Sequence, residues 1–321
     1  MQRRHFLQGL AVSGIAVVMP AAAQVFAKPI TLVVAFAPGG NIDLVARVIA
    51  PPLAKELGQP VVIQNKPGAG GAIGGTEVAR AEPDGSMLLV TTYNPIVVLP
   101  RMAPISYELE NFASVGLIAF TSQVVVIRAE KPRFASFGEL LKFARDNPGK
   151  VSVGHSGIGT TNHIAILQLQ AATGVEFNII AYKGSGPAIL DMLGGQVDLL
   201  VDQLSSSIAN IKSGRAIALT VLSDERDPLL PDVPGTREVG IAGLNISTTT
   251  GLLAPAKTPG PTINALNAAL NKVLGLASVK EQLLNIGSFP MPGKPGVFTT
   301  LLETEDRRAR ALAREGKLKA D

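Results

Sequence analysis

Two glycine-containing loops carry the groups with which a protein can bind an anion without a charged side chain. The first, Pro38-Gly39-Gly40-Asn41, separates a β-branched apolar run at residues 30–36 from a helical pattern that starts at Asp43. Backbone N–H groups at the start of a helix lack partners within it, and the helix dipole adds partial positive charge there. The loop therefore predicts a site for a small anion, whereas the alternative is a plain turn with Asp43 as a helix cap.

A second loop, residues 155–163, repeats this arrangement later in the chain and adds hydroxyl groups. Its small and hydroxyl-bearing residues include Ser156, Gly157, Gly159, Thr160 and Thr161. The same residues also fit an ordinary connecting loop in which Thr160 caps the next helix. Because one such loop lies in each half of the chain, we interpret the two as facing cradles for a small carboxylate.

The glycine-rich stretches do not match the motifs of common enzyme classes. Residues 68–73 end in Ile73 where the dinucleotide-binding motif needs its third Gly, and residues 154–158 lack the final Gly of a nucleophile elbow. The Gly-Lys pairs lack the hydroxyl residue that follows in a phosphate-binding loop. We therefore predict a protein without catalytic residues. The alternative is a hydrolase with Ser156 as nucleophile and His163 as base.

The composition gives little support to a metal or cofactor site. The chain has no Cys and three His, which excludes disulfides and thiolate sites and does not favour a zinc site made of His. We predict no metal and no cofactor. Among the acids of the second half, Asp202 directly follows the expected strand 197–201, so it is the one that we keep as a candidate ligand contact.

Length and charge exclude other classes. With 321 residues, the chain is long enough for two domains. Hydrophobic residues make up 46% and charged residues 17%, a composition that supports packed cores and argues against disorder. The formal net charge is only +4 and the basic residues are scattered, so we expect no nucleic-acid partner.

Residues 1–27 are typical of an export signal rather than of a folded domain. Arg3-Arg4 precedes a mild apolar stretch at residues 9–19, and small residues follow. The Arg pair and the glycines of the apolar stretch fit a twin-arginine signal. We expect cleavage after Ala23 or Ala27 and a periplasmic protein. The alternative is a membrane anchor, for which the apolar stretch is short.

Strands and helices alternate in two successive blocks. The first block has expected strands at residues 30–36, 61–63 and 87–92. The second block has expected strands at residues 151–154, 178–181, 197–201 and 216–222. Apolar strands that alternate with helices predict the α/β class, with a doubly wound sheet in each block.

Two long apolar strands, at residues 115–127 and 246–254, are expected to cross between the blocks and form a hinge. The C-terminal helical stretches cannot form a sheet of their own, so we expect them to pack on the first block; they are residues 261–275, 277–286 and 297–317. This organisation gives a domain 1 of residues 28–122 plus 250–321 and an inserted domain 2 of residues 123–249. A two-lobed fold of this kind binds its ligand in the cleft, at the carboxyl ends of strands.

Short strings spread over nearly the whole chain after the export signal resemble a known family. They are Lys28-Pro29-Ile30, Phe36-Ala37-Pro38-Gly39-Gly40 with Asp43, Asn65-Lys66-Pro67-Gly68-Ala69-Gly70-Gly71 with Gly74, Pro83-Asp84-Gly85, Gly157-Ile158-Gly159-Thr160 with His163, Tyr182-Lys183-Gly184, Gly194-Gly195-Gln196-Val197-Asp198 and Leu253-Ala254-Pro255. In this order and spacing, the chain resembles the periplasmic solute receptors of tripartite tricarboxylate transporters, the Bug family. The resemblance implies a two-lobed periplasmic-binding-protein fold, type II-like, that closes on a small carboxylate.

The resemblance also implies which residues bind the ligand. In this family the carboxylate is held by the Pro-Gly-Gly loop and by the Gly-x-Gly-Thr loop, partly through ordered waters. The implied contacts are Phe36, Ala37, Pro38, Gly39, Gly40, Asn41 and Asp43 in the first loop, Ser156, Gly157, Gly159, Thr160, Thr161 and His163 in the second, and Thr92, Tyr93, Asn94, Tyr182 and Gly184 in the pocket walls.

Asn41 departs from the family pattern, in which a small residue is common at this position. We expect its amide to hydrogen-bond a side group of the ligand, so that ligand specificity is individual to this chain. Ala35 also departs from the pattern, since Pro is usual there, but it lies outside the expected pocket.

We therefore predict a monomeric receptor that binds an organic carboxylate between its lobes and presents it to the large and small membrane subunits of a tripartite transporter. Two alternatives remain open. One is an extracytoplasmic serine hydrolase that uses Ser156 and His163. The other is a receptor that senses its ligand for a membrane kinase.

Overall fold

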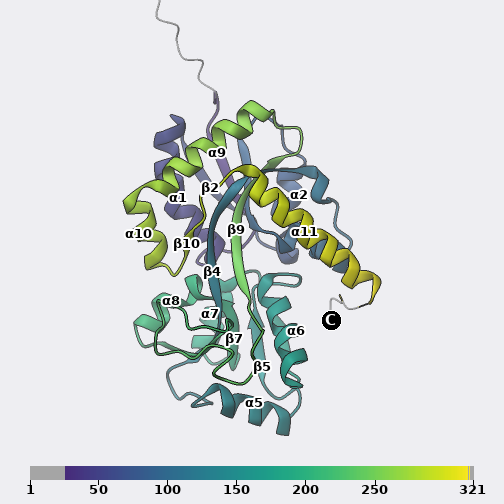
Figure 1. Ribbon diagram of the computed structural model, residues 1–321, viewed down its shortest axis with the longest axis vertical. Coiled ribbons are helices and arrows are strands. Elements are labelled where there is room, and N and C mark those ends of the chain that lie inside the picture. Colours follow the sequence, from purple (N-terminus) through teal and green to yellow (C-terminus); the bar gives the residue numbers. More distant parts are fainter. Residues whose placement is uncertain (1–25, 317, 319–321) are drawn as a thin grey trace, which may run out of the picture.

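The computed structural model describes residues 26–316 and residue 318. It has two α/β lobes, and long strands run from one lobe into the other (Figure 1). The expected export signal, apart from Phe26 and Ala27, lies outside the described residues. The predicted two-lobed α/β fold is confirmed.

The sheet of lobe 1 has a parallel part and an antiparallel part. In spatial order, its strands are β2 (Val61–Asn65), β1 (Ile30–Val34), β3 (Met87–Thr92), β9 (Ser247–Pro255) and β4 (Phe112–Arg128), and β10 (Phe289–Pro290) also pairs with β4. β1 runs parallel to both β2 and β3, whereas β9 runs antiparallel to β3 and β4. Four of the five residues of β1 are buried, as its continuous apolar sequence predicts.

β4 continues into lobe 2 and joins the two parts of the sheet. Its residues 112–122 pair with β9, and its residues 123–128 pair with β7 (Leu199–Gln203) and β8 (Ala216–Val221). β5 (Ser152–His155) lies parallel to β7, and β6 (Asn178–Ala181) lies parallel to β5. The expected pair of long crossing strands is therefore β4 with β9.

Helices pack on the sheet in both lobes (Figure 1). Lobe 1 holds α1 (Asn41–Leu57), α2 (Ala72–Ala79), α3 (Asn94–Val97), α4 (Leu99–Met102), α9 (Gly260–Gly275), α10 (Ala277–Asn285) and α11 (Pro295–Arg314). Lobe 2 holds α5 (Phe137–Asp146), α6 (Thr161–Thr173), α7 (Ser185–Leu193) and α8 (Leu204–Lys212). Within the described residues, no helix has both the length and the apolar character needed to cross a membrane.

The hydrophobic cores follow the two lobes. Apolar residues of α9, α10 and α11 share one core with β1, β3 and α1, and both α9 and α11 contact β4. The cores of lobe 2 use residues between 124 and 246. The exact domain boundaries given above stay a prediction.

Phe26 anchors the start of the described chain in lobe 1. It is 6% exposed and belongs to the core of that lobe. Its carbonyl oxygen accepts a hydrogen bond from Gln59 Nε2 at 2.8 Å. Phe26, which lies between the two expected cleavage positions, is therefore part of the folded lobe.

The start of α1 differs from the prediction. The helix begins at Asn41 rather than at Asp43, because Gly40 already takes the extended conformation of an N-cap residue. Asn41 and Ile42 consequently belong to the first helical turn and not to the loop.

The end of β7 also differs from the prediction and changes the position of Asp202. The strand covers Leu199–Gln203 and not residues 197–201, because Asp202 and Gln203 pair with β4. Asp202 therefore lies inside a strand and not just past its end. Pairing with a distant strand extended β7 over two polar residues that local sequence assigns to a loop.

Candidate ligand-binding site

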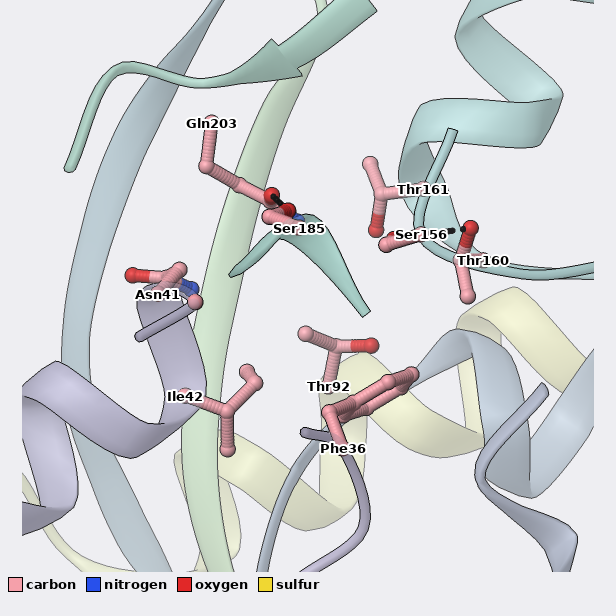
Figure 2. A pocket seen from close by; sticks show the side chains of 10 residues that line it. Phe36, Asn41, Ile42, Thr92, Ser156, Thr160, Thr161, Ser185 and Gln203 are labelled. Atoms are coloured by element: carbon pink, nitrogen blue, oxygen red, sulfur yellow. Dashed lines mark hydrogen bonds between the residues drawn. The ribbon is translucent and has the colours of Figure 1, made fainter. Parts of the chain in front are cut away.

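A cavity lies between the lobes, where β1, β3, β5 and β7 end (Figure 2). Its volume is about 300 Å³, part of which is open to solvent. The residues that line it are Phe36, Gly40, Asn41, Ile42, Thr92, Ser156, Thr160, Thr161, Ser185 and Gln203. Phe36 and Ile42 are the large apolar members, and the others offer hydroxyl, amide or backbone groups. None of these lining residues has an ionisable side chain.

Four helices begin at this cavity. Asn41 is the first residue of α1, Thr161 of α6 and Ser185 of α7, and Gln203 is the N-cap of α8. Each helix start carries partial positive charge and backbone N–H groups without partners in the helix. An anion in the cavity would thus face one helix start from lobe 1 and three from lobe 2, without a Lys or Arg side chain.

Some of these N–H groups are free to donate. Within the described residues, the backbone N–H groups of Ile42 and Thr161 donate no hydrogen bond. By contrast, Asn41 N donates to Ser206 Oγ at 2.9 Å, and His163 N donates to Thr160 Oγ1 at 3.4 Å. The first turns of α1 and α6 therefore offer one unpaired donor each at the cavity wall.

The first glycine loop rests on a buried carboxylate. Asp43 Oδ2 accepts a hydrogen bond from Gly39 N at 2.9 Å, and the same carboxylate binds Arg47 and Asn65. Burial opposes ionisation of Asp43, but hydrogen bonds from Arg47, Gly39 and Asn65 outweigh it and lower the pKa of the carboxyl. Asp43 thus supports the loop from behind and does not line the cavity.

The second glycine loop rests on neutral groups. Thr160 Oγ1 donates to Gly157 O at 2.6 Å and accepts from Ser156 Oγ at 3.2 Å, the bond drawn in Figure 2. Gly157 and Gly159 have φ angles of 137° and 74°, which favour glycine. Thr160 caps α6 and also lines the cavity, so the two interpretations of this residue are compatible.

Two stacked imidazoles support this second loop. The ring centroids of His155 and His163 are 4.6 Å apart, and His163 Nδ1 accepts a hydrogen bond from Gly159 N at 3.2 Å. His155 Nδ1 lies 2.9 Å from Gly157 O and 3.2 Å from Gly157 N, and the tautomer of the ring decides which of the two backbone groups it binds. Burial, and to a lesser degree the neighbouring ring of His163, lowers the pKa of His155 to about 3, and burial also lowers the pKa of His163. Both rings are therefore neutral near pH 7 and hold the loop through hydrogen bonds to its backbone.

These contacts favour a structural role for the histidines over a catalytic one. A serine hydrolase needs a base that hydrogen-bonds the nucleophile and a third group that orients the base. Ser156 Oγ donates to Thr160, and His163 Nδ1 is occupied by Gly159 N. No hydrogen bond joins Ser156 to His163 in the part of the chain that the structure describes.

Hydrogen bonds join the two lobes around the cavity. Ala37 N donates to Lys183 O at 3.0 Å, and Thr161 Oγ1 donates to Asn94 Oδ1 at 2.8 Å. The backbone of Gly184 lies against Ala37. The lobes are therefore in direct contact around the cavity.

The amide of Asn41 is part of this contact. Its Oδ1 accepts from Ser205 Oγ at 2.7 Å, and its Nδ2 donates to Thr250 Oγ1 at 3.1 Å. The amide therefore has a structural role, and its expected hydrogen bond to a ligand stays a prediction. It connects α1 with α8 and β9, although Asn41 also lines the cavity.

Other predicted residues lie behind or beside the cavity. Tyr93 and Asn94 line a second cavity, of about 420 Å³ including space open to solvent, next to α6 and α11. Tyr182 OH donates to Asp191 Oδ2 at 2.9 Å, and Gly184 is the N-cap of α7. The predicted residues that the structure brings together at the cavity itself are Phe36, Gly40, Asn41, Thr92, Ser156, Thr160 and Thr161.

Asp202 lies one residue behind the cavity wall. It is 1% exposed, and its Oδ1 accepts from Ser185 Oγ at 2.5 Å and from Asn162 Nδ2 at 3.1 Å, while its Oδ2 accepts from Ser207 Oγ at 2.7 Å. Burial raises the pKa of the carboxyl to about 6, against the effect of these hydrogen bonds. Asp202 reaches the cavity only through Ser185 and its chain neighbour Gln203.

Three lining residues are absent from the prediction. Ser185 follows Gly184 at a helix start, the same pattern as Gly159-Thr160, so the sequence contained a usable signal. Gln203 lies in the two-residue extension of β7 that sequence did not indicate. Ile42 is an ordinary apolar helix residue, and nothing in the sequence marks it.

Two α/β lobes that enclose a cavity lined by helix starts define the class of two-lobed solute-binding proteins. The family model described as tripartite tricarboxylate transporter family receptor matches residues 45–318, and the chain belongs to this family of periplasmic binding proteins. The predicted resemblance is confirmed.

The chain is similar over most of its length to other proteins. It is 33% identical to protein BugT of Bordetella pertussis, with 98% of each chain covered. Among solved structures, it is 31% identical to MatC from Rhodopseudomonas palustris with bound malate, at a TM-score of 0.83, covering 89% of this chain and 99% of MatC. It is 30% identical to an R. palustris protein solved with adipate, at a TM-score of 0.84, covering 90% of this chain and 97% of that one.

Proposed function

We propose that this chain is a periplasmic receptor that binds a small organic carboxylate between its lobes and delivers it to the large and small membrane subunits of a tripartite transporter. The observation that carries the proposal is the convergence of four helix starts on a cavity whose lining residues have no ionisable side chain. Affinity then comes from backbone N–H groups and helix dipoles that lose their water when the lobes close. The malate and adipate held by two similar proteins support this ligand class.

The residues of the proposed binding site fall into two groups. The direct contacts are Phe36, Gly40, Asn41, Ile42, Thr92, Ser156, Thr160, Thr161, Ser185 and Gln203. The supporting residues, which hold those contacts in place, are Ala37, Pro38, Gly39, Asp43, Asn94, Gly157, Gly159, His163, Gly184 and Asp202. In this proposal, β4 and β9 form the hinge, and the monomer opens and closes around it.

A ligand screen tests the proposal directly. The exported chain is unfolded, refolded without ligand and heated with C4–C6 dicarboxylates, tricarboxylates, acidic amino acids and aromatic acids. A ligand that binds only the folded state stabilises it by about 2.7 kcal/mol at about 100 times its Kd, which raises the melting temperature. A shift confined to one carboxylate class supports the receptor, and no shift with any carboxylate refutes it.

Delivery to a transporter has its own test. Vesicles that contain the two membrane subunits should take up the ligand identified by the screen only when the receptor is added. Uptake that does not depend on the receptor would contradict the delivery role while leaving ligand binding intact.

We also propose that the export signal is cleaved after Ala23. Cleavage after Ala27 would remove Phe26 from the core of lobe 1, and burial of a Phe side chain contributes about 1.5–3 kcal/mol. The mass of the protein isolated from the periplasm decides between the two positions.

A further inference from the structure

Asp202 is a buried ionisable group that is hydrogen-bonded to the cavity wall. Its partner Ser185 lines the cavity, and so does its chain neighbour Gln203. Ser185 Oγ lies 2.5 Å from Asp202 Oδ1 and 3.0 Å from Gln203 Oε1, the second contact being visible in Figure 2. Because one hydroxyl has one proton, Ser185 has none left for a ligand while Asp202 is ionised.

The groups that contact Asp202 are all neutral. Asn162 of α6, Ser185 of α7 and Ser207 of α8 donate to its carboxylate, and the backbone N–H of Gln203 contributes as well. On β4, its strand partner is Val124. Among the residues that the structure describes, no cation therefore offsets the charge of this carboxylate.

The ionisable residues on the elements packed around Asp202 have other partners or other positions. They are His163 on α6 and His155 on β5, which stack on each other, Asp191 on α7, which binds Tyr182, Lys212 in the last turn of α8, Arg128 at the end of β4, Asp43 with Arg47 on α1, and Lys55 and Glu56 in the last turn of α1. Within the described residues, none of them forms a hydrogen bond or an ion pair with Asp202.

A carboxylate in this position tolerates a second negative charge poorly. In the free protein, four neutral donors partly replace its lost hydration, and the pKa of the carboxyl, raised to about 6, still lies below neutral pH. An anionic ligand in the cavity would add a like charge on the other side of the Ser185 hydroxyl. Like charges favour the neutral form of an acid, so the ligand would raise the pKa of Asp202 further.

We propose that Asp202 takes up a proton from solvent when a carboxylate binds and returns it to solvent on release, so that ligand binding by this receptor is coupled to proton uptake. The inference rests on the proposed function and adds a regulatory property to the same site. Once neutral, Asp202 no longer requires the proton of Ser185, whose hydroxyl can then turn to the ligand. Asp202 is in this sense a positioning residue that acts through Ser185.

Calorimetry on the wild-type chain counts the protons. Malate and adipate, both fully ionised at about pH 7.5, are titrated into the protein in phosphate and in Tris, two buffers whose heats of ionisation differ. We expect uptake of on the order of one proton per bound ligand, and a Kd that rises by up to about tenfold per pH unit between about pH 7 and 8.5. Equal heats in the two buffers and a constant Kd would overturn the coupling, while carboxylate binding would stand.

Variants assign the proton to a residue. Asp202→Asn keeps the shape of the side chain, since its amide can donate to Ser207 Oγ and its oxygen can accept from Ser185. We expect this variant to bind both probes with no proton uptake and a flat pH profile. Asp198→Asn is the matched control, because Asp198 is bound to Ser152 and Arg133 and does not line the cavity, so it should keep the wild-type slope.

A second variant keeps the test open if Asp202→Asn does not fold. Ser207→Ala removes the donor to Asp202 Oδ2 without touching the cavity lining, so it should move the pH profile to higher pH. A wild-type slope in Asp202→Asn, or a pH profile of Ser207→Ala that is not shifted from wild type, would overturn the role of Asp202. If neither malate nor adipate binds the wild type and no carboxylate of the screen shifts its melting temperature, the proposed function itself fails.

Discussion

The two glycine loops present similar groups to the cavity but are held by different chemistry. The loop of lobe 1 rests on Asp43, an ionised carboxylate bound to Arg47 and Asn65. The loop of lobe 2 rests on His155 and His163, two neutral imidazoles. The difference teaches that the backbone of a loop can be positioned either by a charge or by neutral rings, and that the two loops should respond differently to acid.

The signs of the pKa shifts give the order in which the two loops lose their support as the pH falls. The pKa of Asp43 is lowered from 3.8, so its stabilisation is present above about pH 3.8 and is lost as the pH falls below that value. The pKa of His155 is lowered from 6.5 to about 3, so its stabilisation is complete above about pH 6.5 and is lost as the pH falls from there towards 3. The histidine support of the loop in lobe 2 should therefore weaken before the Asp43 support of the loop in lobe 1.

The largest expected effect comes from placing a β-branched side chain in either loop. Gly159→Val meets Leu99 at 3.0 Å and Gly39→Val meets Gly186 at 3.9 Å, and both glycines have positive φ, so each change adds strain of about 1–3 kcal/mol. We expect binding to be lost in both variants, with the greater cost in unfolding free energy for Gly159→Val. Calorimetry measures the binding and circular dichroism checks the fold.

Each lobe offers a matched control for that comparison. Gly58 and Gly174 end α1 and α6, have φ angles of 66° and 68°, and leave open space where a Cβ would lie. Gly58→Val and Gly174→Val should show backbone strain but normal affinity. Loss of affinity in these controls, or normal affinity in the loop variants, would contradict the cradle model.

The charged support of lobe 1 is tested by Asp43→Asn. The variant loses charge-assisted hydrogen bonds to Arg47 and Gly39, so its unfolding free energy at pH 7 should fall by about 2 kcal/mol. The difference from wild type should shrink below about pH 3.8, where the wild-type carboxylate itself becomes protonated. Urea unfolding at several pH values measures both effects. The control is Asp146→Asn, because Asp146 forms an exposed ion pair with Lys142, and this variant should change the unfolding free energy by less than about 0.5 kcal/mol.

The neutral support of lobe 2 is tested by acidification of His155→Asn. When the pH falls from about 7 to 5, the imidazole of His155 takes up a proton in the unfolded chain but stays neutral in the folded one, which lowers the unfolding free energy of the wild type by about 2 kcal/mol. The variant has no imidazole at this position and should not show this loss. Comparing the variant with wild type at each pH cancels the opposite contribution of Asp202, which becomes more stabilising as the pH falls through about 6. Parallel pH profiles for the two proteins would show that the imidazole does not support the loop in this way.

The smallest expected effect concerns the contact between the lobes at Asn41. Asn41→Ala removes the hydrogen bonds to Ser205 and Thr250, and one net hydrogen bond contributes about 1 kcal/mol, or about fivefold in affinity. Stopped-flow measurements should show faster ligand release. Asn271→Ala, whose amide binds only within lobe 1, should lower stability without changing the release rate.

Much of the fold could be predicted because its signals are local. The apolar runs of β1 and β3 and the Gly residues between strands and helices show the α/β alternation and both loops within short windows of sequence. The site was predicted less completely. Asn41 and its partner Ser205 are 164 residues apart, so no local pattern could show that the amide is already engaged.

By itself, the sequence determined the α/β class, the two long crossing strands and the two glycine loops, since periodicity and the conformational freedom of glycine act over a few residues. Only the tertiary structure decided that Gln203 lines the cavity, that Asp202 is buried behind Ser185 and that the histidines support a loop. Burial and hydrogen-bond partners are supplied by segments distant in the chain, and they set the charge and the role of each polar group.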